Sequence, residues 1–262
     1  MLDVHPPHAP THTCRDFFIH IATIVVGLFI AIALEQSVEA LHHRRECSEL
    51  YEQMRMEAER NLLVERETIH NVAAAHRSLQ LMKLALVSGK VSGDIVEVAP
   101  LPPAAAKPGP GLIISPSRGT WTAAQAGGIV ALLPHEQVKI YARLDYNAEE
   151  EVHAEDAVVD RLGLLLSEKD RAAYDSTQTT PSRITVAHRD DLLFRIGQAE
   201  NAAENMVFRL AIMQGADEAI SHGVHSLDEM YPYQKRVLHD IDLRYGLGSF
   251  SDSNAKSPTP KK

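Results

Sequence analysis

The alternation of apolar and polar positions separates one continuous apolar run from several long stretches with helical spacing. The run covers residues 17–34, FFIHIATIVVGLFIAIAL, and 12 of its 18 residues are Phe, Ile, Val or Leu. As a helix it would be roughly 27 Å long, close to the hydrocarbon thickness of a bilayer. We therefore expect a single transmembrane anchor at 17–34, held in a lipid bilayer, after a disordered tail at 1–16.

Two other structures are compatible with the same run. A cleavable signal peptide would use Ala31-Ile32-Ala33 as its small-x-small site, but only Arg15 precedes the run, against Asp3 and Asp16. An export signal needs a basic segment there. A buried core helix would need apolar segments around it on all sides, and no other segment is apolar enough. A retained anchor is the prediction.

The charges and cysteines beside the run bear on its orientation. Arg15 precedes it, whereas Arg44-Arg45 and Arg55 follow it. Because positive residues favour the cytoplasmic side, this small difference places the large domain in the cytoplasm. Cys14 and Cys47 lie on opposite sides of the run, so a spanning anchor would prevent them from pairing within one chain.

A long first helix is predicted beyond the anchor, at residues 35–89, because no Gly or Pro occurs between Leu28 and Ser88. Glu65 and His76 fall on its apolar stripe, either as a buried polar pair that fixes the register or as a locally open seam. The stripe has separations of three, four and seven residues. It consists of Tyr51, Met54, Ala58, Leu62, Ile69, Val72, Leu79 and Leu86.

A proline-rich linker is predicted at residues 90–119, which contain six prolines. Two short apolar pieces within it, 95–98 and 112–114, are candidates for a small β-ribbon. A plain connection is the simplest interpretation of the remainder.

A helical bundle domain is predicted at 120–246, followed by a disordered tail at 247–262. Trp121 is the only tryptophan, and it is either a packing anchor or a ligand platform. A second long helix starts at Pro134. Its stripe, which Glu155 interrupts, consists of Val138, Tyr141, Leu144, Ala148, Val152, Val159 and Leu162.

Three further helices complete this domain. A short one is predicted from Ser167 to Tyr174, because Ser167 resembles an N-cap followed by acidic residues. A final helix is predicted from Pro232 to Tyr245, with Gly246 as its cap. Between them, a third long helix covers about 187–222. Its stripe, which only Asp217 interrupts, consists of Leu192, Ile196, Ala199, Ala203, Met206, Leu210, Met213 and Ile220. The predicted fold is all-α: an antiparallel helical bundle with one very long first helix.

The sequence offers little catalytic chemistry. The formal net charge of −9 makes a nucleic-acid partner unexpected. Two Glu-x-x-His pairs, Glu67/His70 and Glu150/His153, have the spacing of di-metal bundles, but their helical phase turns both Glu residues away from the seams. We therefore expect no metal, no cofactor and no enzymatic activity.

Partner binding is the leading functional hypothesis. A helix of about 80 Å would extend beyond the other two long helices, which leaves the stripe near Tyr51, Met54 and Ala58 without a partner in the chain. These three residues and Trp121 are the candidate interaction or packing residues. They favour a homodimer through the first long helix, alongside an unknown membrane protein partner. The alternative is a ligand sensor or an accessory subunit of a membrane transporter or envelope assembly.

Parts of the sequence resemble a group of uncharacterised bacterial single-pass membrane proteins that have an N-terminal anchor and a helical domain of unknown function. The similar segments are DFFIHIATIVVGLFIAIALEQSVEALHHRRE, the long helix with Glu57 and Asn61, and WTAAQAGGIVALLPHEQVKIYARLDY. The resemblance covers about a quarter of the chain. It implies a bacterial membrane protein, with the inner membrane as the expected location, and it transfers no site residues.

Overall fold

The computed structural model describes residues 14–99, 115–167, 182–224 and 226–246. Most of both predicted tails, most of the proline-rich linker, the candidate strand at 112–114 and nearly all of the short helix after Ser167 lie outside these residues. The chain divides into two units, 1–49 and 50–262, which are described separately.

In the first unit, the described residues 14–49 belong to helix α1, which covers Cys14–Val87. The apolar side chains of this unit are exposed, including Phe18 at 67%, Ile24 at 70% and Phe29 at 67%. Among the described helices, α1 alone is long and apolar enough to cross a membrane, and its apolar window is wholly exposed. The predicted very long first helix is therefore confirmed.

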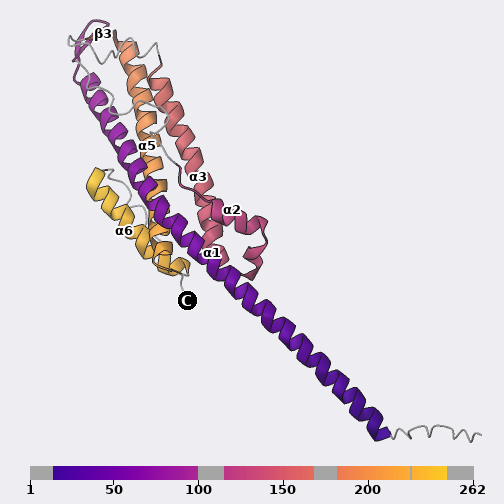
Figure 1. Ribbon diagram of the computed structural model, residues 1–262. Coiled ribbons are helices and arrows are strands. Elements are labelled where there is room, and N and C mark those ends of the chain that lie inside the picture. The colour runs from indigo at the N-terminus through magenta and orange to yellow at the C-terminus, as the bar shows by residue number, and fades with distance from the viewer. Residues whose placement is uncertain (1–13, 100–114, 168–181, 225, 247–262) are drawn as a thin grey trace, which may run out of the picture. The chain divides into compact units, whose positions relative to one another are not determined.

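The second unit is mostly helical, as predicted (Figure 1). The remainder of α1 lies beside three helices: α3 (His135–Leu165), α5 (Val186–Ser221) and α6 (Leu227–Tyr245). A short helix, α2 (Gly119–Ala126), and a 3₁₀ turn, η1 (Ile129–Leu132), precede α3. The predicted starts of the second and third long helices are thus correct to within two residues.

The directions of the long helices differ from a purely antiparallel bundle. Contacts between α3 and α5 pair Glu150 with Arg209 and Arg161 with Gln198, so these two helices are antiparallel. In the contacts between α1 and α3, by contrast, residue numbers rise along both helices in the same direction. Near the start of α3, the Tyr51 hydroxyl donates to Gln137. Fourteen residues further along both helices, Glu65 of α1 lies close enough to Glu151 of α3 for the charge of Glu151 to raise the pKa of Glu65. Helices α1 and α3 are therefore parallel.

A small antiparallel sheet, with strand order β1-β2-β3, was only partly expected. Strand β2 (Ile95–Val98) pairs with β1 (Lys90–Ser92) and with β3 (Ser182–Thr185). The ribbon prediction identified β2 but gave it the wrong neighbour, since β1 and β3 occupy both of its edges. Val96, Val98 and Ile184 carry the apolar core into this sheet.

The core of the unit joins α1, α3, α5, α6 and the sheet. Every member of the α5 stripe is buried, as predicted. On α1, Glu65 and His76 are buried too, so the alternative of a locally open seam is wrong. On α3 the stripe was partly misplaced, because Val152 and Val159 are exposed while Glu151 and Val158 are buried.

The face predicted to lack a partner within the chain is covered. Met54 is 7% exposed and Ala58 2% exposed, and Tyr51 is half-buried against Gln137. The long first helix does not leave these residues in water, because the parallel α3 begins beside them. The argument for a homodimer through this face therefore fails.

The ends of two helices follow ordinary capping chemistry. The Thr185 hydroxyl accepts a hydrogen bond from the N–H of His188 at the start of α5. Helix α6 starts at Leu227, five residues before the predicted start, because the Ser226 hydroxyl caps it by accepting from Glu229 N–H. Gly246 ends α6 in the left-handed conformation (φ 65°), as predicted.

Candidate functional site

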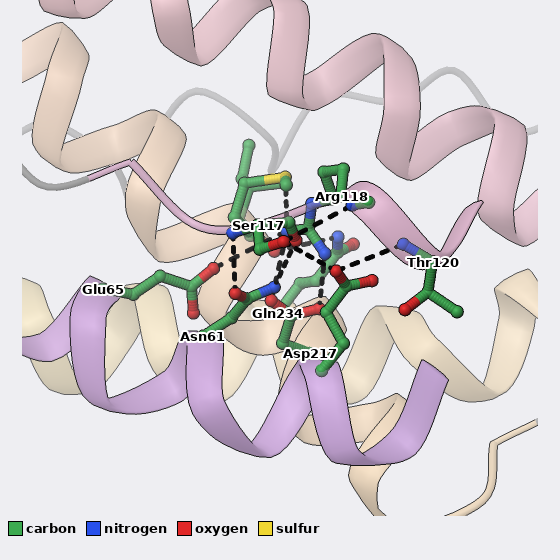
Figure 2. A network of polar contacts seen from close by, with 11 residues as sticks. Asn61, Glu65, Ser117, Arg118, Thr120, Asp217 and Gln234 are labelled. Carbon is green, nitrogen blue, oxygen red and sulfur yellow. Dashed lines mark hydrogen bonds and ion pairs between the residues drawn. The ribbon is translucent and has the colours of Figure 1, made fainter. Parts of the chain in front are cut away.

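Three polar residues on α1, spaced by four positions, face the segment that leads into α2. Asn61 donates from its amide to the C=O of Ser117 and accepts from the N–H of Ser117, both at 2.9 Å. Glu57 accepts from the Ser117 hydroxyl at 2.8 Å and from Thr120 N–H at 3.3 Å. Asn61 and Glu65 point from α1 toward this segment (Figure 2). Side chains of α1 thus bind this segment through hydrogen bonds to its backbone and to the Ser117 hydroxyl.

Arg118 lies at the centre of this polar cluster. Its guanidinium makes two hydrogen bonds to Asp217 of α5, at 2.9 and 3.1 Å, which is the bidentate geometry of a strong ion pair. Its Nη2 lies 3.8 Å from a carboxyl oxygen of Glu65 on α1. Glu151 of α3 is near enough to contribute electrostatically. We name Glu65, Arg118, Glu151 and Asp217 the Arg118 cluster.

The cluster is closed to solvent and incompletely hydrogen-bonded. Glu65 and Asp217 are fully buried and Glu151 is 2% exposed. Within the described residues, several buried atoms have no hydrogen-bond partner: both carboxyl oxygens of Glu65, Oε1 of Glu151, Nε of Arg118 and Nε1 of Trp121. Because buried polar groups without partners are costly, this centre is a poorly satisfied part of an otherwise well-packed unit.

Burial and mutual repulsion shift the acidity of the cluster. Burial raises the pKa of Glu65 well above its ordinary range, and the negative charge of Asp217 adds to the shift. Burial also raises the pKa of Glu151 to about 7, against the opposing effect of Arg118. For Arg118 itself, burial would lower the pKa, but the charge of Asp217 and the hydrogen bonds to it keep that pKa raised. Protons and one guanidinium together neutralise three carboxyl groups.

Two further polar pairs join α1 to α5 beyond this cluster. His76 Nε2 lies 3.0 Å from Glu204, and Lys83 Nζ donates to Glu200 at 2.6 Å. His76 is almost fully buried, so its partner replaces the water that the imidazole loses on folding. One of the two hypotheses had Glu65 and His76 pair with each other, and they do not. Each meets a group from another element.

Trp121 packs inside the unit. It is 3% exposed, and its ring centroid lies 5.3 Å from that of Tyr141 on α3. Burial raises the pKa of Tyr141 to about 12, with Tyr51 as a second contributor. Of the four candidate residues, Trp121, Tyr51, Met54 and Ala58, the structure places all four on the inner faces of this unit, in packing positions.

Sequence reasoning missed the residues that make up most of the cluster. Arg118 lies in a segment predicted to be a linker, and Glu151 was not among the residues of the predicted stripe on its helix. One signal was available: Glu65 and Asp217 each interrupt an otherwise apolar stripe. Two acidic residues at core positions of different helices require a shared cation or bound protons.

A separate groove of about 770 Å³ lies between α3, α5 and α6. Phe208, Ile212 and Leu238 are among its apolar lining residues, and Arg143 and Lys235 contribute cationic groups. Its volume falls within the range of small-molecule sites. Within the described ranges, no three of the His, Cys, Asp and Glu side chains are placed to hold a metal ion.

Comparisons with known proteins returned no match, whether the chain was compared with protein-family models, with curated proteins or with solved structures.

Proposed function

We propose that the protein is a membrane-anchored helical protein that acts by binding partners. The observation that carries the anchor is the complete exposure of an 18-residue apolar window on α1. Leaving so many large apolar side chains in water is unfavourable, whereas a bilayer favours them by roughly 0.3 to 0.6 kcal/mol each. Retention of the run as a transmembrane helix in a bacterial inner membrane follows from the same proposal.

The closed Arg118 cluster supports a binding role over a catalytic one. Its perturbed carboxyl groups would attract attention as acid–base candidates. A catalytic group must reach its substrate, however, and Glu65 and Asp217 are fully buried. The cluster instead joins α1, α3 and α5 to the segment that contains Arg118, which is a structural role.

Membrane fractionation tests the anchor. The full chain should stay with the membrane pellet after washing at high salt and at alkaline pH. Replacing Ile24 and Phe29 by Arg should release it, because charges near the centre of a span each cost roughly 2.5 to 3.5 kcal/mol. A matched control replaces Leu63 and Leu84, which are exposed on α1 in the second unit. Wild-type protein recovered in the supernatant would refute the anchor.

Cysteine labelling tests the orientation. We propose that Cys47 and the second unit lie in the cytoplasm and that Cys14 lies on the outer side, as the arginine distribution favours. A membrane-impermeant maleimide applied to intact cells should then label Cys14 alone. Labelling of Cys47 alone would reverse the orientation.

The groove between α3, α5 and α6 favours a second candidate function, that of a ligand sensor. Arg143 and Lys235 are exposed cations without an ion-pair partner among the described residues. Arg209 is neutralised by Glu150 at 3.0 Å. The groove also contains two acidic residues, Asp228 and Asp242. Asp228 lies in the first turn of α6, where the helix dipole favours a negative charge. An apolar floor with cationic groups matches a ligand that has an apolar chain and an anionic head.

A long-chain fatty acid is the probe for this second candidate. It should bind the detergent-solubilised full chain more tightly than the uncharged alcohol of equal chain length. Changing Arg143 and Lys235 to Gln should weaken binding of the fatty acid about tenfold and leave binding of the alcohol unchanged, since only the anionic head interacts with the two cations. Changing Lys90, an exposed cation on β1, serves as control. Equal binding of both probes to all variants would exclude the sensor while leaving the anchor proposal intact.

A further inference from the structure

Residues 115–126, which include α2, are attached to the second unit mainly through polar contacts. The main apolar cluster draws on α1, α3, α5, α6 and the sheet, and none of its members comes from 115–126, whose buried apolar side chains are Trp121 and Ala124. The segment is held by Arg118, by the hydrogen bonds of Asn61 to Ser117 and by the contact of the Trp121 ring with Tyr141. Its position therefore depends on this polar centre and on two buried side chains, whereas the long helices share the main apolar cluster.

That centre has a surplus of acidic groups. Arg118 faces Glu65 from α1, Glu151 from α3 and Asp217 from α5. With all three ionised, one cation would face three anions in a buried site, and neighbouring like charges cannot all remain ionised cheaply there. The attached position of the segment consequently needs bound protons.

Two further carboxyl groups, one on α1 and one on α3, contact the segment. Glu57 of α1 accepts from the hydroxyl of Ser117, and Glu155 of α3 accepts from the hydroxyl of Ser115 at 2.7 Å. Neither brings a cation, and Glu155 adds to the repulsion felt by Glu151. The groups facing the segment are thus acidic on both helices.

We propose that residues 115–126 form a proton-sensitive latch. With the surplus carboxyl charge neutralised by protons, Arg118 stays among Glu65, Glu151 and Asp217 and the segment is closed. Loss of these protons releases the segment from the helices, while α1, α3 and α5 remain packed through their own apolar core. Release uncovers the polar face of α1 around Asn61, a surface that the closed latch hides.

The direction of the pH dependence follows from linkage. Glu151 has a pKa of about 7 in the closed state, and release of the segment, which brings water to the cluster, returns this pKa to the ordinary carboxyl value of about 4.5. Between these two values the closed state holds a proton that the released state has lost. Closing therefore becomes less favourable as pH rises, by up to about 300-fold for Glu151 alone. The raised pKa of Glu65 extends the effect in the same direction.

Trp121 gives a direct readout, because it is the only tryptophan and lies three residues after Arg118. Acrylamide quenching of its fluorescence should be measured on the full chain in detergent micelles between pH 5 and 8.5. Hydrogen exchange of the α5 amides reports on the rest of the unit in parallel. We expect quenching to rise through about pH 7 with no change in α5 protection. Quenching that does not vary with pH, or that rises only together with loss of α5 protection, would overturn the latch.

Two variants sharpen the test. Glu151→Gln keeps the shape of the side chain and cannot lose a proton, so the rise in quenching near pH 7 should be strongly reduced. Glu149→Gln, an exposed change on the same helix, should leave the wild-type profile in place. A Glu151→Gln profile identical to that of Glu149→Gln would also overturn the latch.

Discussion

Gly215 of α5 and Gln234 of α6 lie so close that a β-carbon on Gly215 would meet the backbone of Gln234, at 2.8 Å from its nitrogen. The side-chain amide of Gln234 also donates to the C=O of Ile212, one turn earlier on α5. Glycine at 215 is therefore what allows α6 to pack directly on α5.

Gly215→Ala should destabilise the protein by about 1 to 3 kcal/mol, because the new methyl group must push the two backbones apart. Chemical denaturation of the full chain measures the change. Gly197→Ala is the matched control on the same helix. Nothing lies within 4 Å of a β-carbon there, so it should stabilise the helix by about 0.5 to 1 kcal/mol. Similar effects of the two changes would mean that the α5–α6 contact is looser than described.

Arg118→Ala should cost about 3 to 5 kcal/mol at neutral pH, because it leaves Asp217 and Glu65 buried without their cation. The free energy of unfolding by urea is the appropriate measurement. Arg55→Ala, which removes exposed pairs with Glu52 and Glu59, provides the comparison and should cost less than about 1 kcal/mol. A loss for Arg118→Ala as small as this would show that the ion pair contributes little.

The stability of the second unit should depend on pH through Glu151. Its pKa is raised to about 7 on folding, so the native state binds the extra proton. The resulting stability is fully present below the ordinary carboxyl range and is lost as pH rises through about 7, by about 3 kcal/mol in total. Urea unfolding of wild type and of Glu151→Gln, compared at pH 5 and pH 8, checks this. The difference between the two proteins should favour wild type more at pH 5 than at pH 8, and an unchanged difference would contradict the assignment.

Removal of α1 should abolish cooperative folding of the remaining chain. Ile69, Val72 and Leu86 of α1 belong to the same apolar core as α5, so a chain starting at Thr120 exposes the other side of that core. Thermal circular dichroism should then show a broad, non-cooperative loss of helix. A chain starting at Leu50, which keeps the whole second unit, is the control and should melt cooperatively. A sharp transition in the shorter chain would show that α1 is dispensable.

Helix positions were predictable where one type of residue repeats at one spacing. The α5 stripe could be identified residue by residue, because its core positions are apolar apart from Asp217. On α3 the same rule failed at one place. Val152 was chosen as the buried residue because it is apolar, but Glu151 is the one that faces the core. Its buried position depends on Arg118, 33 positions earlier, which no local pattern can reveal.

The sheet shows a second limit. The apolar alternation at Ile95–Val98 indicated a strand, yet its two neighbours are the short segments Lys90–Ser92 and Ser182–Thr185. Which segments pair with β2 depends on which loops lie at the same end of the helical bundle, and this depends on the directions of the helices. The parallel arrangement of α1 and α3 was likewise invisible, because apolar spacing determines which face is buried and leaves helix direction undetermined.

The order of helices also delays the burial of α1 during synthesis. His76 of α1 pairs with Glu204 of α5, 128 residues later, and the core residues of α1 are likewise covered only after α5 has been made. At about 5 to 20 residues per second, a ribosome needs on the order of 10 s to make that stretch. During this interval the nascent chain carries an unprotected apolar stripe on α1, which makes the newly made chain a natural client for a chaperone that shields apolar surface until α5 emerges.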